Sequence, residues 1–307
     1  MAKDFIRFCS AEKQATLAMK QIVEAKLTQS VGTNRNFKES LKLFCENIKE
    51  NKQGDLQHAT KEMAYAYLEK RSGEVAQKTL DMDRQAIQCY FVAKGEMKEG
   101  ERLDVIKSEK ETVLERRAYT PEQVALVASS QNERNAFATE LAYASGLRAH
   151  ELLTIRTPQE QPAHVRLYES GELKGQEKNL DTKWQGRDGV IYTVAGKGGL
   201  IREVLVPQNL ADRLETHRLD NLKSITDRGV HYQQRYDIAG GNKWSSSFTN
   251  AAKRTLGWST GAHGLRHSYA QERLKELEAF CPRDKALETV SQEMGHFRPD
   301  VTTVYLR

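Results

Sequence analysis

Two runs of β-branched residues stand in the middle of a sequence whose other apolar patterns are helical. Residues 189–194 (GVIYTV) and 202–207 (REVLVP) flank a glycine-containing turn at 195–201 (AGKGGLI). Such runs around a turn predict an antiparallel hairpin. Helical patterns precede this stretch and return from Asn209 onward, separated by a loop at 236–244. The sequence therefore predicts a mainly α fold with a small antiparallel β-sheet (α+β).

The N-terminal part of the chain has the pattern of a small helical bundle. Apolar residues recur at helical spacing from Phe37 to Ile48, and similar patterns continue as far as Gly95. We assign residues 31–95 to a helical domain and residues 1–30 to a separate N-terminal helical segment or arm.

A charged stretch leads from this domain to a second one. Residues 96–116 are rich in charge and poor in apolar periodicity, which is typical of an interdomain linker. A new helix is expected after it, because Thr120 can act as N-cap, Pro121 suits the first helical position and Gln123 completes a capping box. We assign residues 117–307 to the second domain.

Composition restricts the class of protein without identifying its function. The 307 residues are 38% hydrophobic and 29% charged, and no apolar run is long enough to predict a membrane span. Charged residues interrupt the N-terminus, which argues against a signal peptide and for a cytoplasmic protein. The four widely spaced cysteines are expected to be reduced thiols. A net charge of +5 is compatible with a polyanionic partner.

Several basic residues could carry chemistry, although each has an ordinary structural explanation when taken alone. Arg148 and Glu151 are three residues apart on an expected helical face and could form a surface ion pair. Lys197 lies at the tip of the predicted hairpin, where a lysine is usually just solvated. His263 and Arg266 share a face of an expected helix start, and two groups that can be cationic repel each other unless an anion lies nearby.

The C-terminal stretch EMGHFRPDVTTVYLR adds a histidine and a tyrosine. Pro299 disfavours helix at the residue before it, so one helix should end near His296 and another should begin near Pro299. A turn between them allows His296 and Tyr305 to converge, whereas one continuous helix would hold them apart. Taken by itself, Tyr305 fits two interpretations: a core residue of an ordinary last helix, or a reactive group.

Taken together, these residues suit the attack of a tyrosine on a phosphodiester. Two guanidinium groups can bind the negatively charged oxygens of the transition state, a lysine can protonate the leaving 5′ oxygen, and a histidine can accept the tyrosine proton. The sequence has no carboxylate cluster or His/Cys set suited to Mg²⁺ or Zn²⁺. We therefore expect no cofactor, with fixed cations in the place of a metal.

The sequence resembles the tyrosine recombinases of the phage integrase type. The matching motifs are ASGLRAHEL, GKGGLIREVLVP, HGLRHSYA and MGHFRPDVTTVYL, in the order of the family and over residues 117–305. Residues 30–95 resemble the core-binding domain of the family more loosely.

The resemblance implies a role for each candidate residue. Tyr305 would form a 3′-phosphotyrosyl link to DNA and leave a free 5′-hydroxyl. Lys197 would act as general acid, and His263 would assist proton transfer. The phosphate oxygens would be held by Arg148, Arg266 and His296, with Glu151 supporting the arginines.

The resemblance also implies partners. Double-stranded DNA sites would be bound by four protomers, which exchange strands through a Holliday junction, whereas the free protein would be a monomer or a weak oligomer. Integration or excision of a mobile element, with accessory DNA-bending proteins, would be the biological setting, and the protein would be associated with the nucleoid.

The sequence departs from the family pattern in two places. The family usually carries a further C-terminal segment that packs on a neighbouring protomer, whereas only Leu306 and Arg307 follow Tyr305 here. We also expect so short a tail to be weakly anchored, so that DNA or a partner protomer orders Tyr305. The stretch 157–188 is longer and more polar than the family's usual connection between the first arginine motif and the lysine hairpin.

Two alternatives to this function remain open. A type IB topoisomerase-like enzyme would share the tyrosine chemistry but relax supercoils, and a non-catalytic DNA-binding protein could keep the fold. Residues 1–30 could be an arm for a separate DNA site, a dimerisation helix, or a leading helix that packs or contacts a partner.

Overall fold

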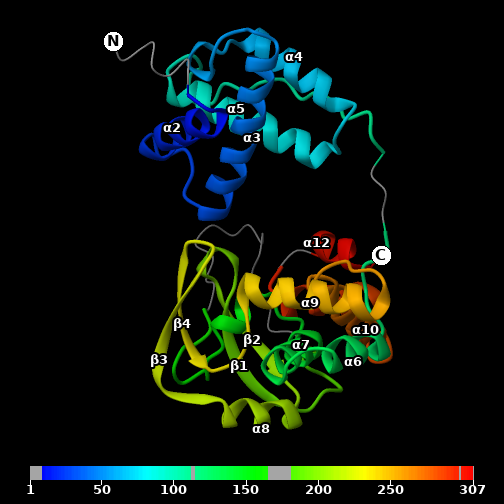
Figure 1. Cartoon of the computed structure of the whole chain (residues 1–307). Coiled ribbons are helices and arrows are strands. Elements are labelled where there is room, and N and C mark those ends of the chain that lie inside the picture. The colour runs from blue at the N-terminus through cyan, green and yellow to red at the C-terminus, as the bar shows by residue number, and fades with distance from the viewer. Residues whose placement is uncertain (1–8, 112–114, 165–180, 297–298, 307) are drawn as a thin grey trace. The chain divides into compact units, whose positions relative to one another are not determined.

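The chain forms two compact units. The computed structural model describes residues 9–111, 115–164, 181–296 and 299–306 (Figure 1). The first unit is Met1–Val113 and the second is Leu114–Arg307. Within the described residues, no helix is both long enough and apolar enough to span a membrane.

The first unit is a helical bundle around one apolar core. Its helices are α2 (Ala11–Glu24), α3 (Val31–Glu50), α4 (Lys61–Ser72) and α5 (Gln77–Ala93), with a short 3-10 helix η1 (Leu56–His58) before α4. Side-chain caps begin three of these helices, and their apolar faces meet in a core that includes Ile22, Phe44, Leu68 and Phe91.

Parts of both flanking segments belong to this core. Helix α2 packs on α3 and α5 through small apolar residues such as Ala15 and Ala18, so the stretch assigned to an N-terminal helical segment or arm contains a core helix. Residues after α5 pack there too, because Met97 and Leu103 are buried and the N–H of Leu103 donates to Oε1 of Gln88 at 3.1 Å. Their apolar side chains are the physical reason why the start of the expected linker lies on the bundle.

The second unit contains most of its helices on one side and its strands on the other (Figure 1). Its first helix, α6 (Pro121–Ser129), has the predicted capping box of Thr120 and Gln123. The helices that follow in chain order are α7 (Glu133–Ser145), η2 (Glu151–Leu153), α8 (Gln208–Thr216), α9 (Gly241–Leu256), α10 (Gly264–Leu277), α11 (Arg283–Glu293), α12 (Pro299–Thr303) and η4 (Val304–Leu306).

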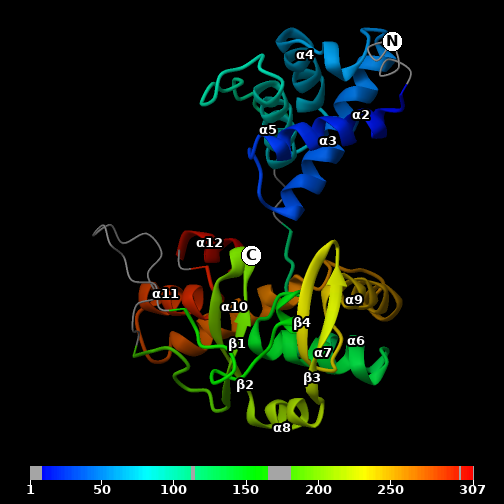
Figure 2. The ribbon, with the colours of Figure 1, turned by 90° about the vertical axis from the view of Figure 1, so that its left-hand side faces the viewer.

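The predicted hairpin is present, and a second hairpin follows it. Strand β1 (Val190–Ala195) pairs antiparallel with β2 (Ile201–Val206), as the sequence predicted. A separate sheet is formed by β3 (Arg218–Asp227) and β4 (Val230–Tyr236), which the sequence analysis missed (Figure 2). The fold is thus mainly α with small antiparallel sheets.

The second hairpin has a local signal that was overlooked. Its turn contains Arg228 and Gly229, with φ angles of 50° and 79°. Two positive φ values at the centre of a two-residue turn match the right-handed twist of paired strands, and glycine adopts this conformation readily. The alternation of Ser224, Ile225 and Thr226 before the turn completes the strand pattern.

Part of the long polar stretch 157–188 packs against α10 and α11; residues 165–180 lie outside the described residues. Oγ1 of Thr182 lies 2.6 Å from Oγ1 of Thr289, and Arg187 pairs with Glu276 at 2.7 Å. The backbone N–H of Trp184 donates to the carboxylate of Glu293 at 3.1 Å. This segment therefore supports the helices that carry the C-terminal candidate residues.

Candidate active site

The turn after α7 places Arg148 against Glu151. The helix ends at Gly146, whose φ of 60° is left-handed and suits glycine. The backbone N–H and Nη1 of Arg148 then donate to the carboxylate of Glu151 at 2.8 and 2.6 Å. The sequence placed this pair on one helical face; the structure forms it across a turn instead, because Gly146 ends the helix first.

Glu151 is the centre of a buried group of charges. Its side chain has no exposed surface, its Oε2 accepts a hydrogen bond from Nη2 of Arg202 at 2.9 Å, and Nη1 of Arg266 lies 3.9 Å away. Burial by itself would raise the pKa of Glu151, but the charges of Arg202, Arg148 and Arg266 hold that pKa well below its usual range. Glu151 is therefore ionised and orients three guanidinium groups.

Arg202 is a residue of this group that the sequence analysis missed. It lies on β2 with its side chain almost fully buried, and its Nη1 donates to the backbone carbonyl of Glu293 at 2.6 Å. Arg202 thus joins the first hairpin to Glu151 and to the end of α11. A charged residue at an inward position of a strand, opposite Val194, was the available signal.

Arg266 lies in the first turn of α10 and is wholly buried. Its Nη1 donates to the carbonyl of Gly146, and its Nη2 donates to the carbonyl of Met294 at 3.0 Å and to Nε2 of His296 at 3.1 Å. Burial and the charge of Arg148 lower the pKa of Arg266 to about 9, which leaves it protonated at neutral pH. Arg266, from the second arginine motif, is therefore hydrogen-bonded directly to Gly146 of the first arginine motif.

His296 is a neutral acceptor in this arrangement. A guanidinium only donates hydrogen bonds, so Nε2 of His296 accepts from Arg266 and its proton is assigned to Nδ1, which donates to Oγ1 of Thr302 at 3.1 Å. Burial and the charges of Arg266 and Arg148 lower the pKa of His296 to about 2. The predicted break is present, since α11 ends at Glu293 and α12 begins at Pro299.

Tyr305 is held among histidine rings. Its hydroxyl lies 3.1 Å from Nε2 of His263, and its ring centre lies 4.7 Å from that of His267 and 4.8 Å from that of His296. Its backbone carbonyl accepts from Nε2 of Gln271 at 3.1 Å, and 9% of the residue is exposed. The expectation of a weakly anchored Tyr305 is therefore wrong for the isolated chain.

His263 precedes the first turn of α10 and faces the Tyr305 hydroxyl. Partial removal of its ring from water, together with the charges of Arg266 and other basic groups, lowers the pKa of His263 to about 4. A neutral imidazole with a free lone pair on Nε2 can accept the phenol proton.

Lys197 lies at the turn of the first hairpin, in the short 3-10 helix η3 (Lys197–Gly199); its side chain lies outside the described part of the chain. The turn is close to the charged group, because a Cβ added to Gly196 would lie 3.5 Å from Oε1 of Glu151. The structure thus gathers the side chains of Arg148, Glu151, His263, Arg266, His296 and Tyr305, and brings the backbone of the Lys197 turn beside them. His267 and Thr302 are additional neighbours, and His267 adjoins Arg266 in the sequence.

We expect the stability of the protein to decrease in mild acid because of these histidines. Their pKa values in the folded chain, about 4 for His263 and about 2 for His296, lie below the ordinary value of 6.5. Between pH 6.5 and about 4 the unfolded chain therefore binds more protons, and the free energy of unfolding falls as pH falls. Urea unfolding of the wild type and of a His263→Gln/His296→Gln variant should show the steeper decrease in the wild type. Equal slopes would contradict the prediction.

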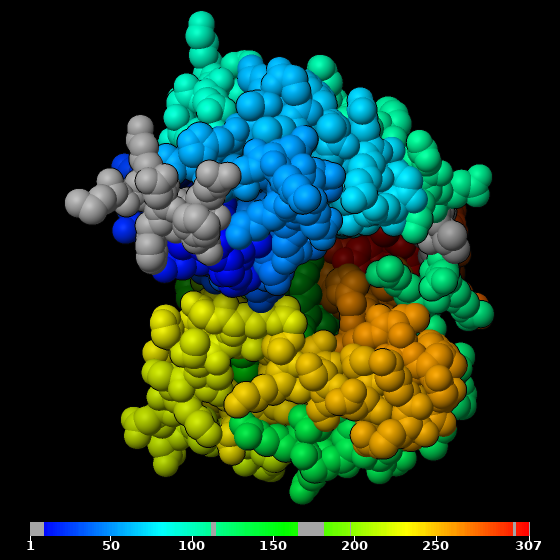
Figure 3. Space-filling view, turned by 45° about the horizontal axis from the view of Figure 1, so that its top comes forward, coloured from blue at the N-terminus to red at the C-terminus, as the bar shows by residue number. Residues whose placement is uncertain are grey.

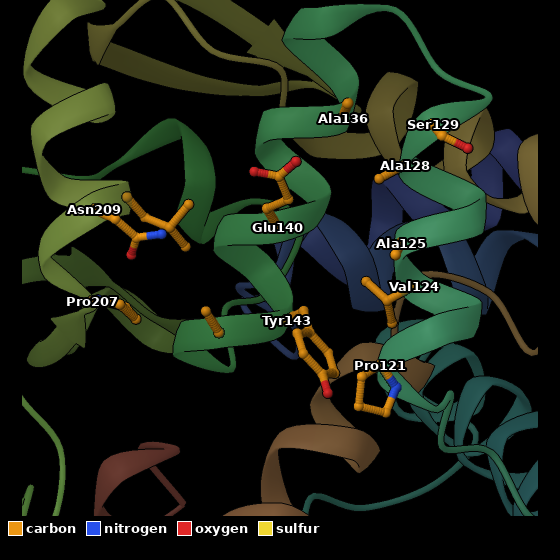
Figure 4. A pocket seen from close by; sticks show the side chains of 12 residues that line it. Pro121, Val124, Ala125, Ala128, Ser129, Ala136, Glu140, Tyr143, Pro207 and Asn209 are labelled. Carbon is orange, nitrogen blue, oxygen red and sulfur yellow. The ribbon is translucent and has the colours of Figure 1, made fainter.

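An apolar cavity of about 610 Å³ lies elsewhere in the second unit (Figure 4). Side chains of α6 and α7, including Val124 and Tyr143, line it together with Pro207 and Asn209 before and within α8. Its described lining contains none of the candidate residues. The candidate site is therefore a cluster of charged and aromatic groups at helix and hairpin ends and not this cavity.

Solved structures show the same fold. No family model and no curated protein matches the sequence. A lambda integrase dimer bound to a COC′ core site has 15% sequence identity and a TM-score of 0.58, over 96% of this chain and 76% of that chain. The XerH site-specific recombinase bound to palindromic difH substrate has 14% identity and a TM-score of 0.57, over 95% and 81%.

A third structure, the Tn1549 transposon integrase in complex with transposon right end DNA, has 14% identity and a TM-score of 0.53, over 96% of this chain and 94% of that chain. The similarity covers both units in each case. The chain therefore has the α+β fold of the tyrosine recombinases and integrases.

Proposed function

We propose that this chain is a site-specific DNA recombinase that cleaves and rejoins DNA through Tyr305. The observation that carries the proposal is the convergence of Tyr305 with His263, 3.1 Å from its hydroxyl, and with the buried guanidinium of Arg266, whose Cζ lies 5.7 Å from the tyrosine ring centre. The neighbours of this tyrosine come from two motifs: His263, Arg266 and His267 belong to HGLRHSYA, and His296 belongs to the motif of Tyr305 itself.

The proposed reaction is an exchange of ester bonds. The Tyr305 oxygen bonds to the phosphorus, the bond from phosphorus to the 5′ oxygen breaks, and a 3′-phosphotyrosyl link results. Nε2 of His263 accepts the phenol proton, and Lys197 donates a proton to the 5′ oxygen. Because the new ester keeps the energy of the old one, the reverse step can rejoin DNA without ATP. We propose no cofactor.

The phosphate would be held by Arg148, Arg266 and His296, with Glu151 orienting the arginines. Arg148 keeps 20% of its side-chain surface exposed, whereas Arg266 keeps none. The Tyr305 ring lies beside the Arg266 guanidinium, so we propose that DNA binding shifts Tyr305 and opens this group to the phosphate. DNA would then release the tyrosine from an anchored position.

The proposed assembly is a tetramer on two DNA sites that passes through a Holliday junction. One structure of similar fold is a lambda integrase tetramer bound to a Holliday junction, with 15% identity and a TM-score of 0.55. In this chain, the helical domain 31–95 would bind DNA together with the catalytic domain 117–307. The natural role would be integration or excision of a mobile element, with accessory DNA-bending proteins in a DNA-associated complex.

Recombination between two copies of the DNA that brackets the coding sequence tests the function. A plasmid that carries both copies is incubated with the protein, and the products are separated on a gel. We expect deletion or inversion of the segment between the copies. Relaxed circles without recombinants would instead indicate a topoisomerase-like enzyme, and bound but unchanged DNA would indicate a binding protein.

A further inference from the structure

Trp258 presents an open aromatic face close to the candidate site. It lies in the loop between α9 and α10 and is 42% exposed. Its ring is parallel to that of the buried Tyr119, with ring centres 5.2 Å apart and an angle of 2° between the planes. Since Tyr119 covers one face of the indole, the exposed surface belongs largely to the other face. Helix α9 and the residues after it, gold to orange in Figure 3, form a continuous part of the surface.

Hydrogen bonds fix this aromatic pair to the start of α10. The Tyr119 hydroxyl accepts from the N–H of Thr260 at 2.8 Å, and the N–H of Tyr119 donates to Oγ of Ser268 at 2.8 Å. A Cβ added to Gly264 would lie within 2.6 Å of Tyr119, Thr260 and the carbonyl of Arg117. Gly264 follows His263, so the pair is held directly beside the residue that faces Tyr305.

Exposed basic residues flank the aromatic pair along the chain, two before Tyr119 and two before Trp258. Arg116, Arg117, Lys253 and Arg254 are exposed, and the carbonyl of Arg117 accepts from Oγ1 of Thr260 at 2.8 Å. In the described part of the chain, no carboxylate pairs with Arg116, Arg117 or Lys253.

The charge of Arg117 also reaches the site. Burial and the charge of Arg266 are the leading causes that lower the pKa of His263, and Arg117 adds to them. Arg117 is therefore within electrostatic range of the histidine that faces the proposed nucleophile.

We infer that the open face of Trp258 and the guanidinium of Arg117 bind the sugar–phosphate backbone of DNA next to the phosphate that is cleaved. An indole face packs well on the apolar side of a deoxyribose, and a guanidinium binds a phosphate with two parallel hydrogen bonds. A group of cations without carboxylate partners favours a polyanion over a neutral protein surface. This inference rests on the proposed function and adds a contact outside the catalytic residues.

The salt dependence of DNA binding tests the contact. Binding of a short fluorescent duplex is measured by anisotropy over a range of salt concentrations, in a Tyr305→Phe background that excludes covalent capture. For Arg117→Gln we expect the slope of log K against log salt to fall in magnitude by about 1. Trp258→Ala should weaken binding about fivefold without changing the slope, and Trp258→Phe should retain most of the affinity.

Lys275→Gln is the matched control. Lys275 is exposed in the last turn of α10, nine residues from Arg266 and so about 14 Å further along the helix axis. We expect its slope and affinity to equal those of the parent protein. Circular dichroism melting of each variant checks the fold, and Trp258→Phe keeps the aromatic pair if the alanine variant does not fold.

The two proposals fail in different ways. If Arg117→Gln leaves the salt slope unchanged while the wild-type chain forms covalent complexes, the backbone contact is overturned and the recombinase proposal stands. If the wild-type chain forms no covalent complex but Arg117→Gln still lowers the slope, the function fails and the contact stands. Loss of self-association in Trp258→Ala, with unchanged DNA binding, would assign the surface to a second copy of the chain and overturn the contact.

Discussion

Replacement of Tyr305 by phenylalanine should abolish covalent attachment to DNA while leaving the fold and DNA binding intact. The change removes only the hydroxyl that lies 3.1 Å from His263, and the ring can keep its contacts with His267 and His296. The loss of one partly buried hydrogen bond should change the free energy of unfolding by about 1 kcal/mol. Without the oxygen nucleophile, no phosphotyrosyl ester can form.

A nicked duplex from the DNA that brackets the coding sequence provides the measurement, because the fragment released after cleavage diffuses away and the covalent complex accumulates. Denaturing electrophoresis then separates protein linked to DNA from free protein. Tyr192→Phe is the matched control, since Tyr192 is also buried in the second unit and its hydroxyl donates to Glu215 at 2.7 Å, away from the candidate residues. A covalent complex formed by Tyr305→Phe would reject Tyr305 as the nucleophile.

Replacement of Glu151 by glutamine should strongly destabilise the second unit. The amide has no charge, so the almost fully buried guanidinium of Arg202 and the partly buried one of Arg148 would lose their counter-ion. Breaking a buried ion pair from one side typically costs about 3–5 kcal/mol. We also expect little covalent complex at temperatures where the variant stays folded, because Arg148 and Arg266 would lose the carboxylate charge that orients their guanidinium groups.

Tryptophan fluorescence isolates this effect. All three tryptophans, Trp184, Trp244 and Trp258, lie in the second unit, so their emission during urea unfolding follows that unit and not the N-terminal bundle. Glu203→Gln is the control, because its pair with Lys183 is 39% exposed on the Glu203 side and such pairs contribute about 0–1 kcal/mol. If Glu151→Gln and Glu203→Gln unfold at the same urea concentration, the central role of Glu151 is wrong.

Local signals made much of this structure predictable. The β1–β2 hairpin, the capping box at Thr120 and the break before Pro299 each depend on a few neighbouring residues, and all three are present. The second hairpin also has a local signal in Arg228 and Gly229, but helical patterns before and after these residues led us to predict helix there.

Contacts between distant segments could not be predicted in the same way. Nothing near Arg202 in the sequence indicates that it pairs with Glu151 or with the carbonyl of Glu293. The anchoring of Tyr305 likewise depends on α10, whose residues lie far from it along the chain. The order of the motifs along the sequence was enough to identify the candidate residues. The hydrogen bonds and ion pairs between them are visible only in the three-dimensional structure.

The contacts of Arg202 with Glu151 and with the carbonyl of Glu293 affect the order in which the candidate site forms during folding. Its two bonds join residues 51 and 91 positions away, and ordering such long loops costs conformational entropy before the contacts compensate for it. We expect these contacts to form late and together with the rest of the second unit. Under the proposed function, a partly folded chain would carry Tyr305 without the arginines that Glu151 orients, and it would not yet cleave DNA.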